Sequence, residues 1–136
     1  MAARSKARKR ALDLLYESEA RSLPRVELLA DRLASGEPPV SEYTVSLVEG
    51  VDAHAARIDE LLSEHAVGWT LDRMPAVDRN ILRLGAYELL YVSDVPDQVA
   101  ISEAVHLARD LSTEESPAFV NGLLARLMEL KPTLAV

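Results

Sequence analysis

Apolar residues recur every three or four positions along most of the chain, which is the spacing of one face of an α-helix. The densest such stretch is 69–92, where the apolar residues after Pro75 cover more than a single helical face. A helix that is apolar on nearly every side is normally enclosed by other elements, so we expect this segment to form the centre of the core. It carries Arg79 and Arg83 at i, i+4, and we favour pairing within the chain over phosphate contact for both.

Caps and chain breakers divide the N-terminal half into further helices. A first amphipathic helix is predicted over about 5–21, and a second follows Pro24 and ends at Gly36. Ser41 is a good N-cap for a helical region over 41–67, which fits either one long helix or two.

The C-terminal half shows the same kind of pattern. A turn at 93–97 precedes an apolar stripe that predicts a helix through 101–111. Ser116 is the expected N-cap of a last helix, with Pro117 in its first turn and an end at 131–132. No segment alternates as a strand would, so the predicted fold class is all-α, with six or seven helices.

Composition removes several kinds of chemistry. The chain has 136 residues and no cysteine, so disulfides, thiolate metal sites and cysteine nucleophiles are excluded. We expect no metal and no cofactor, because the three histidines lack the spacing of ligand motifs: His54, His65 and His106. No apolar run is long enough to cross a bilayer, so a cytoplasmic protein without membrane contact is expected.

Charge is unevenly distributed along the chain. Residues 1–10 contain five basic side chains and no acid, so the net charge of −7 divides into +5 for this basic arm and −12 for the remainder. Such an arm either contacts the phosphates of a nucleic acid or is a solvated tail, and charge alone does not separate these alternatives. The acidic remainder suits a basic protein partner.

Two aromatic positions are further candidates for contact with a nucleic acid. Tyr16 lies near the apolar face of the first helix and is either a half-buried core aromatic or a stacking surface. In the last helix, Phe119, Asn121 and Gly122 lie beside the apolar stripe. Phe119 is either an edge of the core or a ligand contact, and Gly122 either permits close helix packing or leaves room for a ligand.

Three motifs in order along the chain resemble those of the NusB family of bacterial transcription antitermination factors. They are R-x-K-A-R-K-R-A-L-D-L-L-Y, then W-x-L-x-R-M-P-x-V-D-R-x-I-L-R-L-x-x-Y-E-L-L, then V-P-x-x-V-A-I-S-E-A-V-x-L-A-R-x-L-S with S-P-x-F-V-N-G-L-L. The resemblance spans almost the whole chain. It implies a single NusB-like helical RNA-binding domain over 1–136, built from two small helical subdomains, and no enzymatic activity.

The resemblance also implies partners and site residues. The partners are the single-stranded boxA RNA of ribosomal RNA operon leaders, the ribosomal protein NusE, and the RNA polymerase antitermination complex. Asp78 is a candidate contact for the basic ribosomal protein. Ser102 departs from the asparagine of the usual I-N-E-A motif, which puts only a polar contact there in doubt. By position, the implied RNA-binding residues are Arg4, Lys6, Arg8, Lys9, Arg10, Tyr16, Phe119, Asn121 and Gly122.

Two other functions compete with this one. A NusB-like domain also occurs as the RNA-binding part of certain ribosomal RNA cytosine methyltransferases, but the chain contains no G-x-G-x-x-G and no room for a cofactor-binding sheet. The second alternative is a helical protein interaction module without RNA specificity. The free protein is either a monomer or a homodimer, and the sequence does not decide between them.

Overall fold

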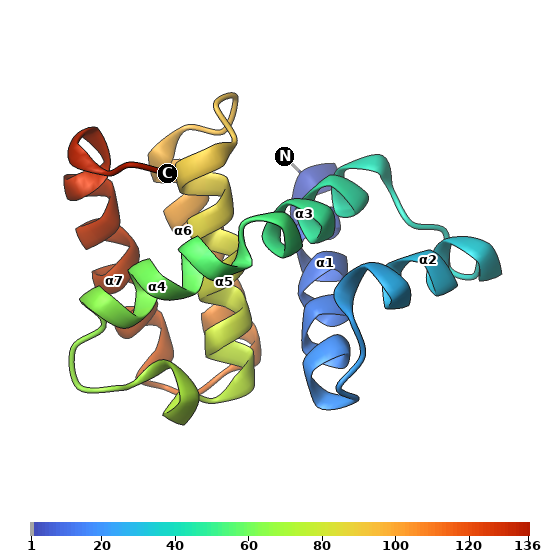
Figure 1. Cartoon of the computed structure of the whole chain (residues 1–136), viewed down its shortest axis with the longest axis horizontal. Helices are drawn as coiled ribbons and strands as arrows, with labels where there is room; N and C mark the ends of the chain where they lie inside the picture. Colours follow the sequence, from blue (N-terminus) through green and yellow to red (C-terminus); the bar gives the residue numbers. More distant parts are fainter. Residues whose placement is uncertain (1) are drawn as a thin grey trace. The chain divides into compact units, whose positions relative to one another are not determined.

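The fold is all-α, as the sequence predicts. The computed structural model describes residues 2–136, and the described chain forms seven α-helices, two short 3₁₀ helices and no strand (Figure 1). It divides into two compact units, the first ending at Ala53 and the second spanning His54–Val136. The α-helices are α1 (Ala2–Ala20), α2 (Arg25–Ser35), α3 (Glu42–Ala53), α4 (Ala55–His65), α5 (Ala76–Tyr91), α6 (Asp97–Leu111) and α7 (Ser116–Leu130).

The first unit consists of α1, α2 and α3, each in contact with the other two. Ser41 caps α3 as predicted, because its hydroxyl accepts a hydrogen bond from the backbone N–H of Thr44 at 3.2 Å. The buried hydroxyl of Thr44 in turn donates to the carbonyl of Ala7 at 3.0 Å, which ties α3 to α1. The apolar core of this unit includes Ala11, Leu12, Leu14, Leu15, Leu28, Leu29, Leu47, Val48 and Val51.

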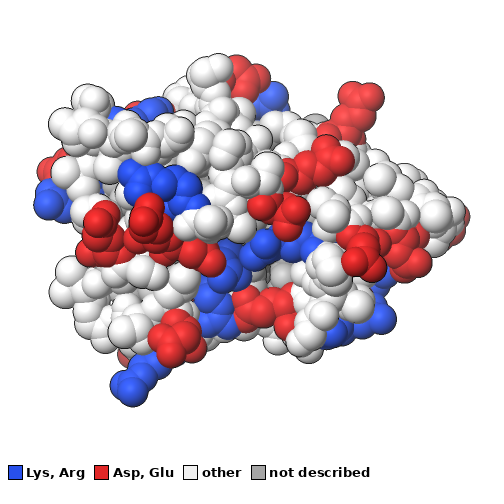
Figure 2. Space-filling model, in the orientation of Figure 1, with Lys and Arg blue, Asp and Glu red and all other residues white. Residues whose placement is uncertain are grey.

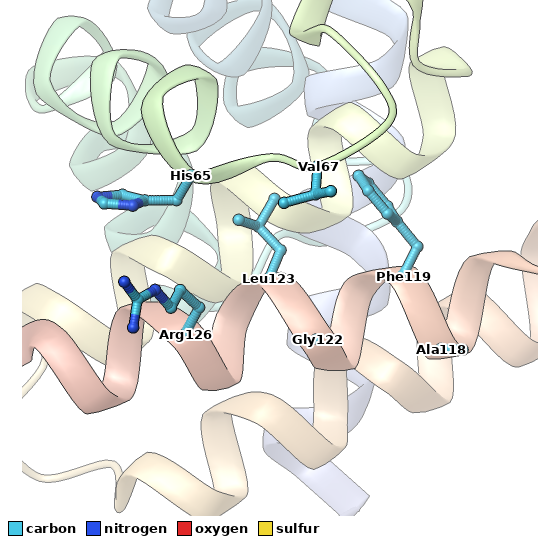
Figure 3. Close-up of a pocket in the computed structure, with 7 residues that line it drawn as sticks. All are labelled: His65, Val67, Ala118, Phe119, Gly122, Leu123 and Arg126. Carbon is cyan, nitrogen blue, oxygen red and sulfur yellow. The ribbon is translucent and has the colours of Figure 1, made fainter.

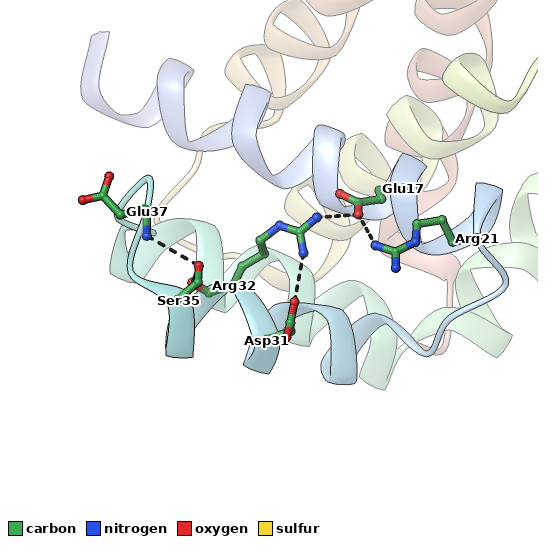
Figure 4. A network of polar contacts seen from close by, with 6 residues as sticks. All are labelled: Glu17, Arg21, Asp31, Arg32, Ser35 and Glu37. Carbon is green, nitrogen blue, oxygen red and sulfur yellow. Dashed lines mark hydrogen bonds and ion pairs between the residues drawn. The ribbon is translucent and has the colours of Figure 1, made fainter.

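An ion-pair network joins α1 to α2 in this unit (Figure 4). The carboxylate of Glu17 accepts from Arg21 one turn later at 2.6 Å and from Arg32 on α2. The Arg21 hydrogen bond, together with the charge and hydrogen bond of Arg32, lowers the pKa of Glu17 below its ordinary value. Glu17 follows Arg10, the last residue of the basic arm, by seven residues, so the network lies about two helical turns beyond the arm along α1.

The region 41–67 is two helices and not one. The helix breaks at His54, whose φ of −109° and ψ of 14° lie outside the helical range, and α4 starts at Ala55. The polar stretch around this position therefore marks the end of the first unit.

The second unit is built around α5, which contacts α4, α6 and α7. The buried residues of α5 occupy every side of the helix, as its sequence predicts. Gly85 allows the closest approach, because a Cβ at this position would lie 2.8 Å from Cδ1 of Leu124 and 3.1 Å from Cβ of Ala104. Gly85 is thus the glycine that close helix packing requires.

Both arginines of α5 have partners within the second unit, and the expected pairing with an acid is confirmed for Arg83. Arg83 makes a bidentate ion pair with Asp59 of α4, with Nε to Oδ1 at 2.9 Å and Nη2 to Oδ2 at 3.1 Å. Arg79 donates to two backbone carbonyls, those of Leu71 and Met74, each at 2.9 Å. These guanidinium groups therefore hold α4 and the 3₁₀ turn Leu71–Arg73 against α5.

Asp78 has a structural role, and the prediction that it contacts a partner protein is wrong. Its side chain has no exposed surface. Its carboxylate accepts hydrogen bonds from the hydroxyls of Ser112 and Ser116, the latter at 2.7 Å. A buried carboxylate is stable only when it is hydrogen-bonded in this way, so Asp78 secures the start of α7 on α5.

Ser116 also differs from its predicted role. It was expected to be the N-cap of the last helix, but α7 starts at Ser116 itself and its hydroxyl donates to Asp78. Glu115 occupies the N-cap position without a side-chain capping bond, and its carbonyl accepts from the backbone N–H of Phe119 at 3.2 Å.

Candidate nucleic-acid interface

The five basic residues of the arm lie on α1, in the first unit, and differ in exposure. Lys6 and Lys9 are exposed, Arg4 and Arg10 are partly exposed, and Arg8 is buried with 3% of its surface exposed. Lys9 pairs with Asp13 at 3.0 Å, but both side chains are nearly half exposed, so this pair holds the lysine only weakly. On the face drawn in Figure 2, acidic and basic side chains are interspersed over both units.

Tyr43 of α3 lies against this arm, although the sequence did not single it out. The guanidinium carbon of Arg4 is 4.2 Å from the centroid of the Tyr43 ring, and that of Arg8 is 5.7 Å from it. A guanidinium over a ring face is held by cation–π attraction while its edge remains able to donate hydrogen bonds. Only the packing of α3 on α1 brings these residues together, so sequence spacing contains no signal for the contact.

Two N–H donor groups of the Arg10 guanidinium make no hydrogen bond. Its Nε and Nη2 atoms are buried without a hydrogen-bond partner. Buried donors are nearly always hydrogen-bonded in folded proteins, so this guanidinium can still donate to an acceptor oxygen.

Tyr16 is 44% exposed, although it lies next to the apolar stripe of α1. A ring with this much exposed surface contributes only part of its area to the core and keeps the rest available for stacking. Tyr16 therefore fits the role of a stacking surface that the sequence left open.

The Phe119, Asn121 and Gly122 positions lie on α7, in the second unit. Phe119 is partly exposed, and its ring meets that of Trp69 edge to face, with centroids 5.0 Å apart and an interplanar angle of 76°. Asn121 and Gly122 are exposed. A Cβ at Gly122 would meet no atom within 4 Å, so the alternative that this glycine serves close helix packing is wrong.

A pocket of about 390 Å³ opens beside these residues (Figure 3). The end of α4, the loop after it and α7 form its walls. Phe119 and Val67 lie toward one end, and His65 and Arg126 lie at the other (Figure 3). The lining residues are His65, Val67, Ala118, Phe119, Gly122, Leu123 and Arg126.

Neither a metal-binding cluster nor a membrane-spanning helix is found among the described residues. Within residues 2–136, no group of three or more His, Cys, Asp or Glu side chains is placed to hold a metal ion. None of the helices in that range is both long and apolar enough to cross a membrane.

A helical protein of two small units, with a basic helix in one and an aromatic pocket in the other, has the features of a binding protein. The comparisons with known proteins identify the family. The sequence pattern of the NusB family matches residues 5–129, and the chain belongs to this family.

Its relatives support the same conclusion. The chain is 60% identical over 135 residues to the transcription antitermination protein NusB of Kineococcus radiotolerans, covering 99% of both proteins. It is 61% identical to the protein of the same name from Thermobifida fusca, covering 98% of this chain and 94% of that one. Both relatives are named as a regulatory factor, which confirms the prediction that the chain is not an enzyme. The same names do not favour the methyltransferase alternative.

Solved structures confirm the fold. A NusB structure from T. maritima matches with a TM-score of 0.82 at 33% identity, over 93% of this chain and 90% of that one. A crystal structure of the antitermination factors NusB and NusE in complex with dsRNA matches with a TM-score of 0.82 at 28% identity, over 95% of this chain and 98% of that one.

Proposed function

We propose that this chain is a cytoplasmic transcription antitermination factor that binds the boxA RNA of ribosomal RNA operon leaders together with the ribosomal protein NusE. The observation that carries the proposal is identity of about 60% over nearly the whole chain to proteins named transcription antitermination protein NusB. A related solved complex contains NusB and NusE with double-stranded RNA, which supports NusE and RNA as the two kinds of partner. In this role the protein acts within the antitermination complex of RNA polymerase.

The residues of the candidate interface are of the types that single-stranded RNA requires. Cationic side chains neutralise its phosphates, and aromatic faces stack on its unpaired bases. The α1 arm supplies the cations, with Arg4 and Arg8 held over Tyr43. Tyr16 on α1 and Phe119 on α7 supply exposed or partly exposed aromatic surface.

NusE is assigned to the acidic part of the molecule on the basis of charge. Residues after the arm carry a net charge of −12, which attracts a basic ribosomal protein and repels RNA. Because Asp78 is buried, the contacts come from other, exposed acidic side chains among the residues after the arm.

Fluorescence anisotropy with a labelled boxA RNA and a scrambled RNA of the same composition tests the proposal. We expect the boxA RNA to bind at least tenfold more tightly at physiological salt, and the preference to persist when NusE is added. Equal binding of the two RNAs in both conditions would show that the RNA assignment is wrong. Binding of NusE without any RNA binding would identify the chain as a protein interaction module.

A further inference from the structure

The helix α2 carries an apolar stripe that the folded chain leaves exposed. Its members are spaced i, i+4, i+7 and i+8, so they lie along one side of the helix. The core of the first unit instead uses Leu28 and Leu29, which lie on a neighbouring side and are each 2% exposed. Exposed apolar residues that are scattered singly are ordinary, but an aligned set is typical of a protein-binding surface. This α2 stripe consists of Val26 and Leu33, which are 44% and 47% exposed, and the exposed Ala30 and Ala34.

The charged residues of α2 make one edge of the stripe acidic. Arg25 pairs with an acid of α3 at 3.3 Å, and Arg32 pairs with an acid of α1. Both arginines therefore turn toward the other helices of the first unit, with 21% and 24% of their side chains exposed. Glu27 and Asp31, in contrast, are exposed, and each follows a residue of the stripe by one position. The outer side of α2 thus combines an apolar stripe with negative charge.

The helix is also held in place before any partner binds. Arg32 lies between Glu17 of α1 and Asp31 of its own helix (Figure 4). Gly36 ends the helix in the left-handed conformation, and its backbone N–H donates to the carbonyl of Arg32 at 3.1 Å. A surface that is already ordered binds a partner without the entropic cost of ordering it.

We propose that the α2 stripe docks an amphipathic, basic helix of a further protein of the antitermination complex, distinct from NusE. The inference rests on the proposed function, which supplies the complex, and goes beyond it by assigning a second protein-binding surface. The apolar side of the docked helix covers the stripe, where Ala30 and Ala34 allow a close approach, and its lysines or arginines face the two acids. NusE is assigned by charge alone, which leaves the apolar stripe unused. A second copy of this chain fits less well, because it brings the same acids against each other.

Replacing the two large residues of the stripe tests the inference. The double variant Val26→Gln/Leu33→Gln removes apolar surface, and its melting temperature should match that of the parent because glutamine is a good helix former. In transcription reconstituted from purified polymerase, boxA RNA and antitermination proteins, the protein concentration that gives half of the full effect should rise about tenfold. The affinities for boxA RNA and for NusE, measured separately by anisotropy, should stay at the parent values. Val99→Gln is the matched control, because Val99 is 39% exposed on α6 in the second unit.

Two outcomes of this experiment overturn the docking surface while leaving the proposed function intact. The first is an unchanged half-maximal concentration in the folded double variant. The second is a weaker affinity for NusE, which would show that the stripe belongs to the NusE site. If the parent protein itself gives no antitermination, the proposed function and this inference are both wrong.

Reversing one charge tests whether the partner is basic. Glu27→Lys should also raise the half-maximal concentration, and more strongly at about 0.05 M than at about 0.3 M salt, because salt screens the attraction. Glu49→Lys is the matched control, since Glu49 is an exposed acid of the same unit on α3. Equal behaviour of the two variants would overturn the assignment of a basic partner.

A photo-crosslinking side chain at Ala30 identifies the occupant in the same reconstituted complex. We expect an adduct with a protein other than NusE, on a segment rich in lysine and arginine. The same side chain at Ser63, which is exposed on α4 in the second unit, should not form this adduct. An adduct with NusE or with a second copy of this chain, or no adduct at all, overturns the inference.

Discussion

Two glycines inside helices of the second unit have opposite surroundings, and this gives a stability prediction. Gly85→Ala would bring a Cβ within 2.8 Å of Leu124 and 3.1 Å of Ala104. Leu124 is fully buried and cannot turn aside without displacing its neighbours. We expect overpacking to lower the free energy of unfolding by about 1–3 kcal/mol, measured by urea denaturation. Gly122→Ala is the control and should be at least as stable as the parent. Equal stability of the two variants would mean that α5 shifts to accept the added methyl group without a loss of stability.

Glu115 gives a prediction about binding. It is exposed at the N-cap position of α7, and its side chain makes no capping bond. The partly exposed Phe119 follows it by four residues, about one helical turn. A carboxylate beside a phosphate path costs on the order of 1 kcal/mol at a surface. Glu115→Gln should therefore tighten boxA RNA binding several-fold, as measured by anisotropy at low salt.

The matched control for this change is Glu27→Gln, since Glu27 is an exposed acid on α2. It should alter RNA affinity less than Glu115→Gln does. Weaker binding by Glu115→Gln at low salt would show that the carboxylate orients a base or a cationic side chain instead of repelling phosphate.

The roles of single residues were the least predictable feature from the sequence. The negative charge of Asp78 suits a basic ribosomal protein, yet its carboxylate accepts hydrogen bonds inside the unit from two serines that follow it by more than thirty residues. Gly122 and Gly85 are indistinguishable in sequence, since both are glycines within helical stretches. The neighbours that separate these cases are brought together only by tertiary packing.

At the scale of elements, sequence predicted almost everything. Prolines, glycines and serines mark the ends of the helices, and the apolar spacing marks their faces, so the helices begin and end close to the expected residues. Gly36, for example, ends α2 in the left-handed conformation with a φ of 67°. The sequence does not decide whether the helix breaks at His54, because no proline or capping signal stands there.

The helix α1 and the aromatic positions should contribute different kinds of binding energy, and salt separates them. Each phosphate neutralised on a single strand contributes roughly −0.7 to the slope of log K against log salt. Replacing all five basic residues with glutamine should flatten this slope by up to about 3.5. Because Arg8 is buried, we expect most of the change to come from Arg4, Lys6, Lys9 and Arg10. Lys131→Gln, which removes a lysine paired with Asp97, is the control for charge.

Stacking releases few counter-ions, so the aromatic variants should behave differently. Tyr16→Ala and Phe119→Ala should each weaken binding by roughly 1–3 kcal/mol while leaving the salt slope nearly unchanged. Phe119→Ala also removes the contact with Trp69, so circular dichroism and melting temperature must first show that the variant is folded. Parent-like RNA binding by the folded aromatic variants, or an unchanged slope after the arm is neutralised, would place the RNA surface elsewhere.

For the whole molecule, the order of the three motifs predicts the family, but the spacing of residues does not predict which side chains meet at the candidate interface. The cations of α1 are consecutive in sequence and were predicted, whereas Tyr43 joins Arg4 and Arg8 only through the packing of α3 on α1. The pocket likewise collects side chains from α4, a loop and α7, and of its lining residues the sequence predicts only Phe119 and Gly122 as RNA contacts. The sequence is sufficient to predict a group of interacting residues that lie on one helix. When the residues come from several elements, the fold is needed to show that they meet.

The division of charge over the molecule predicts that NusE and RNA assist each other. RNA bound to the basic arm also feels the net charge of −12 on the rest of the chain. A basic protein docked on that acidic surface offsets part of the repulsion, so saturating NusE should tighten RNA binding. Coupling between two sites is typically 5- to 150-fold, and it must be reciprocal, so RNA should tighten NusE binding by the same factor.

Titrations of RNA with and without NusE, and of NusE with and without RNA, close this thermodynamic cycle. Because the coupling is electrostatic, it should shrink as salt rises from about 0.05 M to 0.3 M and the screening length falls. Light scattering of each state is the control, since a homodimer that NusE dissociates would also produce coupling, but one that depends on protein concentration and not on salt. The same RNA affinity with and without saturating NusE at low salt would show that the acidic surface does not act on the RNA site.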